Sequence, residues 1–338
     1  MAQARLLEEL LERFKADSGQ YRDWAVPGDD TSRRAALRSL MNIRLPRPLD
    51  EETLRLQDEY LSKRALEKGV VALSEIPAIV EQYGSARPFA DRLSLWQGDI
   101  TRLSVDAIVN AANSQMLGCF VPMHTCIDNC IHTFAGVQLR LACAERMDAL
   151  RAKYGPDYEQ PTAVPMLTGG YNLPAKHVIH VVGPIVERRL TPALERDLAD
   201  CYRNVLDLCR ENGLKSVAFC CISTGVFRFP EERAAGIAVE TVTDWLAENP
   251  GALDRAVFNV FKDEDKALYE RMDLCAVPFP LQLQDPGPSA FCQFERPLVE
   301  PGGLRELLLE EIGKILRPFP QRGNAQGKSL QLVVDRKS

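Results

Sequence analysis

Two cysteines and a histidine lie within eight residues of the sequence, at Cys119, His124 and Cys126. Their spacing, C-x4-H-x-C, encloses a proline, and a turn there would bring two sulfur atoms and one ring nitrogen to a single cation. Zinc is the usual occupant of such ligand sets. Structural zinc sites normally take four protein ligands, whereas catalytic sites take three and leave one position open. The count of three therefore favours one catalytic zinc ion per chain.

Two alternatives account for the same residues. The cysteines could be small buried core residues and His124 an ordinary loop residue, because unpaired cysteine is often buried for packing alone. The zinc could instead be structural, with Cys130 or His132 as a fourth ligand. Cys130 follows Cys126 by four positions and would share a helical face with it, whereas His132 would project from a different part of that helix. The spacing leaves these alternatives open.

The segments around these residues resemble those of a macrodomain, an α/β module that binds ADP-ribose. The motifs that carry the resemblance are GDIT at 98–101, NAAN at 110–113, TGGYNLP at 168–174, HVIHVVGP at 177–184 and STGVFRFP at 223–230. Most macrodomains continue from NAAN into a glycine-rich run, and this chain has the cysteine and histidine loop there. That replacement is similar to the zinc-dependent macrodomains, a branch of the protein-ADP-ribose hydrolases. The resemblance covers roughly residues 93–272.

The resemblance implies that ADP-ribose and mono-ADP-ribosylated proteins are the ligands, and it suggests which residues hold them. Asp99 is expected at the adenine, where its carboxylate would accept from the amino group, and the neighbouring Ile100 is expected to contact the ligand. The alternative is that Asp99 caps a turn. Phe261 resembles the ring that lines the adenine pocket, although it could equally be a core residue. Asn113 is expected to bind the distal ribose, and Asn110 is expected to hold the loop.

The segment that follows the apolar run 216–222 is expected to bind the two phosphates. Its residues are Ser223, Thr224, Gly225, Val226 and Phe227. Backbone N–H groups between a strand and a helix N-terminus can form an anion-binding nest, and a glycine lets the backbone approach phosphate closely. An ordinary strand-to-helix turn is the alternative. Many macrodomains have tyrosine and glycine where this chain has Phe227 and Arg228, so a ring is kept and a hydroxyl group is lost.

Asp128 matches the aspartate that follows the glycine-rich run in ordinary macrodomains. The alternative is a first-turn residue that the helix dipole favours. Asp128 and Asn113 are the candidate catalytic residues, the first to position or deprotonate water and the second to orient the ribose.

The favoured function is a zinc-dependent hydrolase that removes mono-ADP-ribose from protein side chains. The resemblance suggests an ester linkage to Asp or Glu, and some members of the branch act with a sirtuin-like ADP-ribosyltransferase. The rival classes are a reader module that binds ADP-ribose without turnover and has a structural zinc, and a zinc-stabilised scaffold.

Short apolar runs alternate with helical patterns from residue 93 onward, which predicts a three-layer α/β fold with a mainly parallel central sheet. The expected strands are 93–97, 106–110, 177–182, 216–222 and 255–261, and the expected helices are 127–151, 192–212 and 231–248. Sheets of this kind bind ligands beyond the carboxyl ends of their strands. The NAAN motif, the cysteine and histidine loop and the segment 223–229 all follow such ends.

The sequence before residue 92 is expected to form a small helical lobe that covers one face of the sheet or gates the substrate. Apolar residues recur at helical spacing over 4–17, Thr31 can cap a second helix through Met41, and Asp50 starts a third. We predict a lobe at 1–91, a zinc-containing macrodomain at 92–275 and a third region at 276–338. That region would hold a proline- and glycine-rich linker, a helix at 304–317 and a polar tail with a strand at 330–334.

Composition limits the classes of protein to consider. The 338 residues, of which 46% are hydrophobic, suffice for one large domain or two smaller ones. With 41 basic and 47 acidic residues the net charge is −6, so a broad basic surface for nucleic acid is not expected. No apolar run reaches the roughly 18–20 residues that span a bilayer, and the N-terminus lacks a signal-peptide pattern. We therefore expect a cytoplasmic protein without a membrane anchor.

Overall fold

The chain divides into two compact units, Met1–Pro280 and Leu281–Ser338. The computed structural model describes residues 3–274, all of which belong to the first unit. The linker predicted from residue 276, the helix at 304–317 and the strand at 330–334 lie outside the described residues. Among the described helices, none combines the length and the apolar content needed to cross a bilayer.

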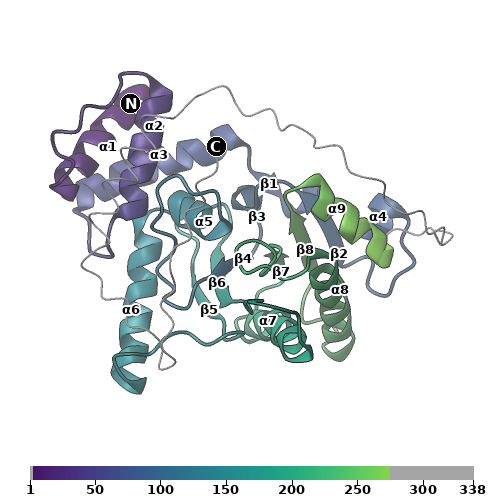
Figure 1. Ribbon diagram of the computed structural model, residues 1–338. Helices are drawn as coiled ribbons and strands as arrows, with labels where there is room; N and C mark the ends of the chain where they lie inside the picture. The colour runs from purple at the N-terminus through teal and green to yellow at the C-terminus, as the bar shows by residue number, and fades with distance from the viewer. Residues whose placement is uncertain (1–2, 275–338) are drawn as a thin grey trace, which may run out of the picture. The chain divides into compact units, whose positions relative to one another are not determined.

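A six-stranded sheet forms the centre of the first unit (Figure 1). Its strands are β2 (Leu93–Gln97), β4 (Ala107–Ala112), β5 (Met166–Gly169), β6 (His177–Val182), β7 (Ser216–Phe219) and β8 (Arg255–Val260). Their order across the sheet is β2-β8-β7-β4-β6-β5, and every pair is parallel except β5 with β6. Val178, Ile179 and Val181 on β6 are all fully buried, as expected for a strand covered on both faces. The predicted mainly parallel sheet is confirmed.

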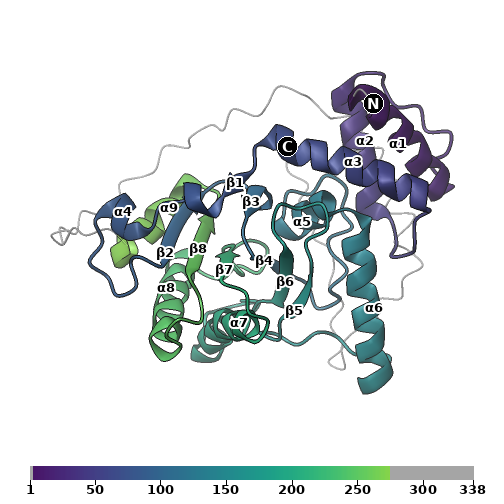
Figure 2. The same ribbon diagram turned by 180° about the vertical axis from the view of Figure 1, so that it is seen from behind.

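Helices cover both faces of this sheet (Figures 1 and 2). The helices α5 (Ile127–Ala135) and α6 (Val137–Tyr154) contact β4 and β5, while α7 (Pro192–Glu211) and α8 (Glu231–Glu248) pack against each other on the opposite side. The indole N–H of Trp245 on α8 donates to Asp207 on α7 at 3.0 Å. Two shorter helices, α4 (Ile79–Tyr83) and α9 (Asp263–Tyr269), contact β2, and β1 (Val71–Ala72) pairs with β3 (Leu103–Ser104). The three-layer α/β architecture is therefore as predicted.

The single helix predicted over 127–151 is wrong, because the chain breaks at Gly136. This residue has φ +95°, a left-handed conformation that side-chain-bearing residues rarely adopt. The break lets Gln57 of the N-terminal lobe accept a hydrogen bond from the N–H of Val137 at 3.0 Å. A residue far away in the sequence thus satisfies the first free donor of α6.

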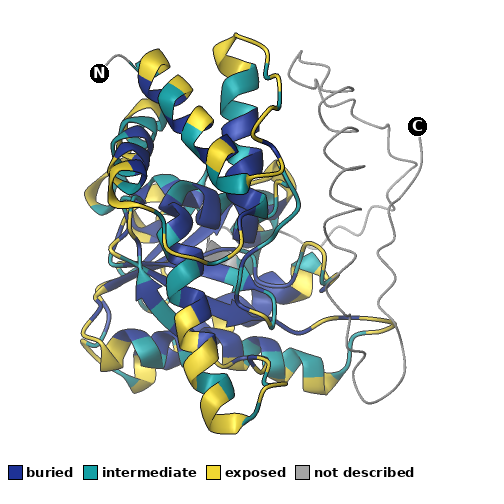
Figure 3. Ribbon diagram, turned by 90° about the vertical axis from the view of Figure 1, so that its left-hand side faces the viewer, coloured by how far each residue is buried: buried dark blue, intermediate teal, exposed yellow. Residues whose placement is uncertain are grey.

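The N-terminal lobe consists of α1 (Gln3–Ser18), α2 (Asp30–Ile43) and α3 (Glu51–Lys68). Its second helix is capped by Asp29, which accepts from the N–H of Ser32 at 2.9 Å, so the predicted cap at Thr31 is wrong. Asp50 caps α3 as predicted. The lobe contacts α5 through α2 and α3, and dark buried residues continue from the lobe into the rest of the unit (Figure 3). It therefore covers a helix next to the sheet rather than the sheet itself.

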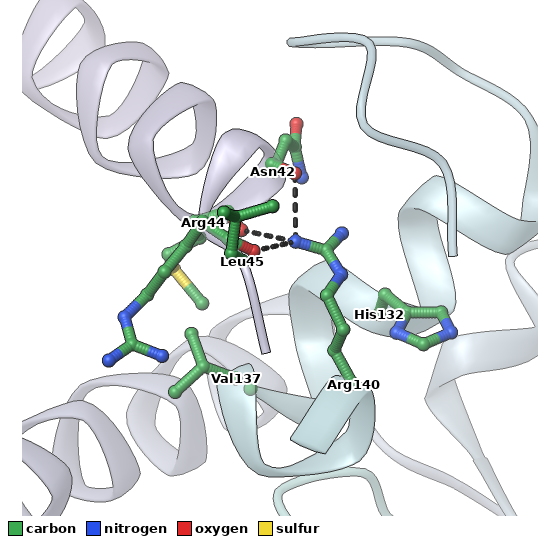
Figure 4. A pocket seen from close by; sticks show the side chains of 8 residues that line it. Asn42, Arg44, Leu45, His132, Val137 and Arg140 are labelled. Carbon is green, nitrogen blue, oxygen red and sulfur yellow. Dashed lines mark hydrogen bonds between the residues drawn. The ribbon is translucent and has the colours of Figure 1, made fainter. Parts of the chain in front are cut away.

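Arg140 on α6 joins the lobe to the loop that precedes α5. Its guanidinium group donates to the carbonyl oxygens of Met41, Asn42 and Arg44 at 3.1, 2.8 and 2.6 Å (Figure 4). It also donates to the carbonyl of Leu117 at 2.7 Å. Burial lowers the pKa of Arg140 to about 10, so the group remains charged at neutral pH. A small hollow beside it is lined by residues of α2, α5 and α6, by the segment after α2 and by Gly136, and by none of the residues predicted to bind ADP-ribose.

We expect Arg140→Met to lower the free energy of unfolding by on the order of 3 kcal/mol, because buried carbonyl groups lose a charged donor. Urea denaturation measures this change. The matched control is Arg203→Met, since Arg203 forms an exposed pair with Glu248 and should cost less than about 1 kcal/mol. Equal losses in the two variants would contradict the structural role assigned to Arg140.

Candidate active site and metal centre

The predicted site residues meet at one edge of the sheet. Asp99 follows β2, Asn113 follows β4, Ser223 follows β7 and Phe261 follows β8. Because these four strands are parallel, their carboxyl ends lie at the same edge. The structure therefore brings together segments that are up to 162 residues apart in the sequence, Asp99 and Phe261 being the most distant.

The metal loop, residues 118–126, holds the three predicted ligands. The Sγ atom of Cys119 lies 3.5 Å from Nδ1 of His124, and these atoms and the Sγ atom of Cys126 all lie within 4.8 Å of one another. Ligand bonds of roughly 2.0 Å for nitrogen and 2.3 Å for sulfur would suit such a group after a small side-chain adjustment. All three residues are partly buried. The arrangement fits one cation bound by two sulfur atoms and one nitrogen atom.

The two thiols of the metal loop share a hydrogen bond. This bond lowers the pKa of Cys119, and the nearby His124 lowers it further, while the same bond raises the pKa of Cys126. Cys119 is therefore the thiol that ionises more readily, and a thiolate is the form that binds metal. Cys126 is also the N-cap of α5, where its sulfur accepts from the N–H of Asn129 at 3.4 Å. The start of α5 thus fixes the position of one ligand.

Neither candidate for a fourth ligand joins this group among the described residues. The sulfur of Cys130 lies 3.7 Å from the guanidinium group of Arg38 and 3.9 Å from the carbonyl of Thr125. His132 belongs to a separate group with Cys143 and His180. The geometry therefore favours three protein ligands over a closed set of four.

In the second group, His132, Cys143 and His180, the ring of His180 belongs to a buried polar chain and lies 3.7 Å from the sulfur of Cys143, whereas neither ring nitrogen of His132 has a hydrogen-bond partner among the described residues. Nδ1 of His180 accepts from Asn110 at 3.0 Å, so Nε2 carries the proton and donates to Thr168 at 2.9 Å. Burial lowers the pKa of His180 to about 3 and raises the pKa of Cys143 to about 12, so both side chains are neutral. Because both ring nitrogens of His180 are already engaged, this side chain has no free nitrogen to offer a metal.

Asp128 is buried between the two asparagines of the NAAN motif. Its Oδ1 atom accepts from Asn110 at 2.8 Å, and its Oδ2 atom accepts from Asn113 at 3.3 Å. Burial raises the pKa of Asp128 to about 6. Nε2 of His132 approaches to 3.6 Å, but burial keeps the pKa of this ring low, so the contact is not an ion pair. Asn113 also donates to the carbonyl of Gly118 at 3.4 Å, which connects the motif to the metal loop.

Asp99 has two partners, one of which the sequence did not reveal. Its Oδ1 atom accepts from the N–H and hydroxyl groups of Thr101, so it does cap the turn. Its Oδ2 atom lies 2.6 Å from Nζ of Lys68 on α3, and this ammonium group also lies 3.4 Å from the centre of the Phe134 ring. Burial would raise the pKa of Asp99, but Lys68 and Thr101 lower it. No spacing in the sequence relates Lys68 to Asp99, so only the fold could reveal this contact.

The other two residues predicted at the adenine differ in exposure. The side chain of Phe261 is 74% exposed, so it is not a core residue, whereas Ile100 is only 1% exposed. The ring of Phe261 is therefore free to pack against a ligand. Ile100 is buried as a whole residue, so its side chain is not free to contact one.

The loop after β7 has the features of an anion-binding nest. Ser223 and Arg228 have φ angles of +66° and +59°, and the N–H of Arg228 donates to the carbonyl of Gly225 at 3.1 Å. The N–H groups of Gly225, Val226 and Phe227 donate to no other group in the described part of the chain. Gly225 and Val226 are exposed, and α8 begins four residues after Phe227. Free N–H groups near a helix N-terminus favour binding of an anion.

The chain is similar to proteins of known family. The sequence profile described as Macro domain matches residues 109–238. A "Protein-ADP-ribose hydrolase" of Treponema medium is 47% identical over 266 residues, which is 78% of this chain and 96% of that protein. A protein of the same name from Staphylococcus aureus (strain MSSA476) is 45% identical over 69% of this chain and 82% of its own length.

The chain also matches a solved macrodomain structure and part of a longer protein. The crystal structure of a Trypanosoma brucei macrodomain in complex with ADP-ribose is 30% identical, with a TM-score of 0.52, and the match covers 69% of this chain and 94% of that one. A "Probable bifunctional ADP-ribose hydrolase/ADP-ribosyltransferase" of Fusarium oxysporum f. sp. cubense is 39% identical over 79% of this chain but only 46% of that protein. With this fold and these relatives, the chain belongs to the macrodomain family of protein-ADP-ribose hydrolases.

Proposed function

We propose that this protein is a zinc-dependent hydrolase that releases mono-ADP-ribose from modified protein side chains, with ester linkages to Asp or Glu as its substrates. The observation that carries the proposal is the group of three ligands, Cys119, His124 and Cys126, at the sheet edge where Asn113 and Asp128 also lie. A binding module would need the nucleotide contacts but not an open metal position beside them. The names of the relatives support the hydrolase class.

In this proposal ADP-ribose lies along the carboxyl edge of the sheet. Asp99 accepts from the adenine amino group, the backbone of Ile100 lies beside the base, and Phe261 packs against the ring. The phosphates accept hydrogen bonds from the free N–H groups of 225–227, and Ser223 and Thr224 shape the start of that loop. Asn113 then reaches the distal ribose. The Trypanosoma brucei macrodomain was crystallised in complex with ADP-ribose, which supports this choice of ligand.

In the proposed reaction, the metal ligands and the residues around Asp128 would have separate roles. Cys119, His124 and Cys126 would hold a zinc ion, which would supply Lewis acidity when bound. Both oxygen atoms of Asp128 are engaged by Asn110 and Asn113. The carboxylate therefore fixes the amide of Asn113, which in turn orients the ribose hydroxyl groups. Orientation of the ribose would be as important as acidity, because two thiolates would neutralise the charge of such an ion.

The proposal also includes the source of the modification, a sirtuin-like ADP-ribosyltransferase. It rests on the resemblance of the metal loop to the zinc-dependent branch. The name of the Fusarium oxysporum relative, which joins a hydrolase to an ADP-ribosyltransferase, is consistent with such a pairing.

The test is release of ADP-ribose from a protein carrying mono-ADP-ribose on aspartate or glutamate, followed by chromatography. A substrate linked through serine should be released much more slowly if the ester assignment is right. Treatment with a chelator should abolish release, and added zinc should restore it. Binding of ADP-ribose without release from either substrate would favour the reader function instead.

The close approach of Gly183 to the phosphate loop provides a test of the binding site. A Cβ atom at Gly183 would overlap Oγ of Ser223 and lie 2.8 Å from the side chain of Ile222. We expect Gly183→Ala to push this loop out of position and to weaken ADP-ribose binding by about 10-fold or more, on the order of 1.4 kcal/mol. Calorimetric titration measures the affinity.

The matched control for this change is Gly28→Ala in the N-terminal lobe. A Cβ atom there has no neighbour closer than 3.9 Å, so the affinity should stay at the wild-type value. If Gly183→Ala also binds with wild-type affinity, the loop after β7 is not the phosphate site.

A further inference from the structure

We propose that α2 of the N-terminal lobe holds the metal loop in the conformation that binds zinc. Arg38 and Asn42 on this helix are the positioning residues. The inference rests on the proposed function, because it concerns the same metal ligands. It goes beyond that function by assigning a role to a helix outside residues 109–238, the segment that the Macro domain profile matches.

The metal loop makes few hydrogen bonds of its own. Within the described residues, its N–H groups from 118 to 125 donate one hydrogen bond to a backbone carbonyl, from His124 to Val121 at 3.2 Å. Two of its three metal ligands, Cys119 and His124, lie in this part of the loop. A segment with so little internal bonding keeps a defined shape only if neighbouring side chains hold it.

Arg38 supplies the first of these external contacts. Its Nη2 atom donates to the carbonyl of His124 at 2.8 Å and to Oδ1 of Asn129 at 2.9 Å. Asn129 then donates to the carbonyls of Cys119 and Val121 at 3.3 and 2.9 Å. One guanidinium group thus fixes the backbone of one metal ligand directly and the backbone of another through a single amide.

Asn42 supplies the second contact, at the turn just before His124. Its Oδ1 atom accepts from the N–H of Met123 at 3.1 Å, and its Nδ2 atom donates to Thr133 on α5 at 2.9 Å. Met123 has φ +57°, a left-handed conformation that costs a non-glycine residue roughly 1–2 kcal/mol. Asn42 is only 1% exposed, so water cannot replace it. The strained turn that presents the His124 ring is therefore held to α5 through the lobe.

Residues that hold metal ligands in place typically change metal affinity by 10- to 100-fold when they are replaced. Arg38 and Asn42 hold the metal loop through hydrogen bonds to its backbone, and neither side chain is a predicted metal ligand. We therefore expect Arg38→Met and Asn42→Leu to weaken zinc binding by about 10-fold or more. The maximal rate of ADP-ribose release should fall in parallel, while KM changes little, because the nucleotide contacts lie on other loops.

The experiment measures zinc affinity of the full chain by competition with a chromophoric chelator, together with kcat, KM and the melting temperature. Arg33→Met is the matched control, because Arg33 lies on the same helix but pairs with Glu8 inside the lobe. Its zinc affinity should equal the wild-type value. Arg38→Lys keeps a donor for the carbonyl of His124 and should recover part of the lost affinity.

The outcomes separate this inference from the proposed function. If the wild-type protein takes up no zinc, the proposed metal centre itself is wrong. If the wild type binds zinc and a folded Arg38→Met variant binds it equally well, only the role of α2 is overturned. If Asn42→Leu fails to fold, the comparison of Arg38→Met with Arg38→Lys still decides, since Arg38 is only partly buried. Equal loss of affinity in Arg33→Met and Arg38→Met would indicate a general stability effect and would also overturn the inference.

Discussion

The Cys126→Ala variant is expected to lose its zinc and to release ADP-ribose from modified protein more slowly by orders of magnitude. Replacement of Cys126 leaves Cys119 and His124, and two ligands hold zinc poorly. Binding of free ADP-ribose should persist, because the adenine and phosphate contacts that we propose come from other loops. Elemental analysis, turnover and calorimetric titration on this one variant separate a catalytic metal from a structural one.

The sulfur of Cys126 also caps α5, so the experiment needs a control for the loss of this helix cap. Loss of the cap alone should cost about 1 kcal/mol of stability. Cys126→Ser keeps a capping oxygen and removes the thiolate, so it should match Cys126→Ala in zinc content and turnover but melt at a higher temperature. Cys130→Ala, which changes a cysteine outside the ligand group, should keep its zinc. A zinc-free protein with full hydrolase activity would refute the proposed mechanism, and joint loss of stability, binding and turnover would indicate a structural zinc.

Gly225→Glu should abolish detectable binding of ADP-ribose while leaving the fold intact. Gly225 is exposed, and a Cβ atom there would have no neighbour within 4 Å, so the protein itself tolerates a side chain. The carboxylate would instead occupy the space in front of the free N–H groups of Val226 and Phe227, where it would repel and displace the phosphates. Calorimetric titration should show no binding at ligand concentrations that saturate the wild type.

The matched control is Gly28→Glu, which adds the same charge to the N-terminal lobe, where the nearest atom to a Cβ is 3.9 Å away. This variant should bind ADP-ribose normally. Normal binding by Gly225→Glu would mean that the phosphates lie elsewhere.

The sequence predicted the sheet well because apolar runs bounded by polar motifs mark buried parallel strands. The bounds of β6 and α8 agree with the prediction to the residue. Motifs at the strand ends also predicted that Asp99, Asn113 and Ser223 would meet at one edge of the sheet, since parallel strands end at the same edge. By contrast, the short strand β5 was not predicted, because Met166–Gly169 is too brief to show an alternation of polar and apolar residues.

The contacts that hold the site could not be predicted, because they join residues far apart in the chain. Lys68 with Asp99, and Arg38 with the carbonyl of His124, leave no pattern within a local window. The break at Gly136 was missed for a related reason. Apolar residues continue at helical spacing across it, and a single glycine inside such a pattern is usually tolerated.

The contacts between the lobe and α6 bear on how freely the lobe can vary in sequence. Arg140 donates to main-chain oxygen atoms of Met41, Asn42 and Arg44, and every amino acid offers the same oxygen. Exchange of the side chains at 41 and 44 therefore leaves these acceptors in place. The bond between Asn42 and Thr133 joins two side chains, so a change at one of them requires a compensating change at the other. In related proteins, substitutions at positions 42 and 133 should therefore occur together. Substitutions at positions 41 and 44 of the lobe should not be coupled to a change at position 140.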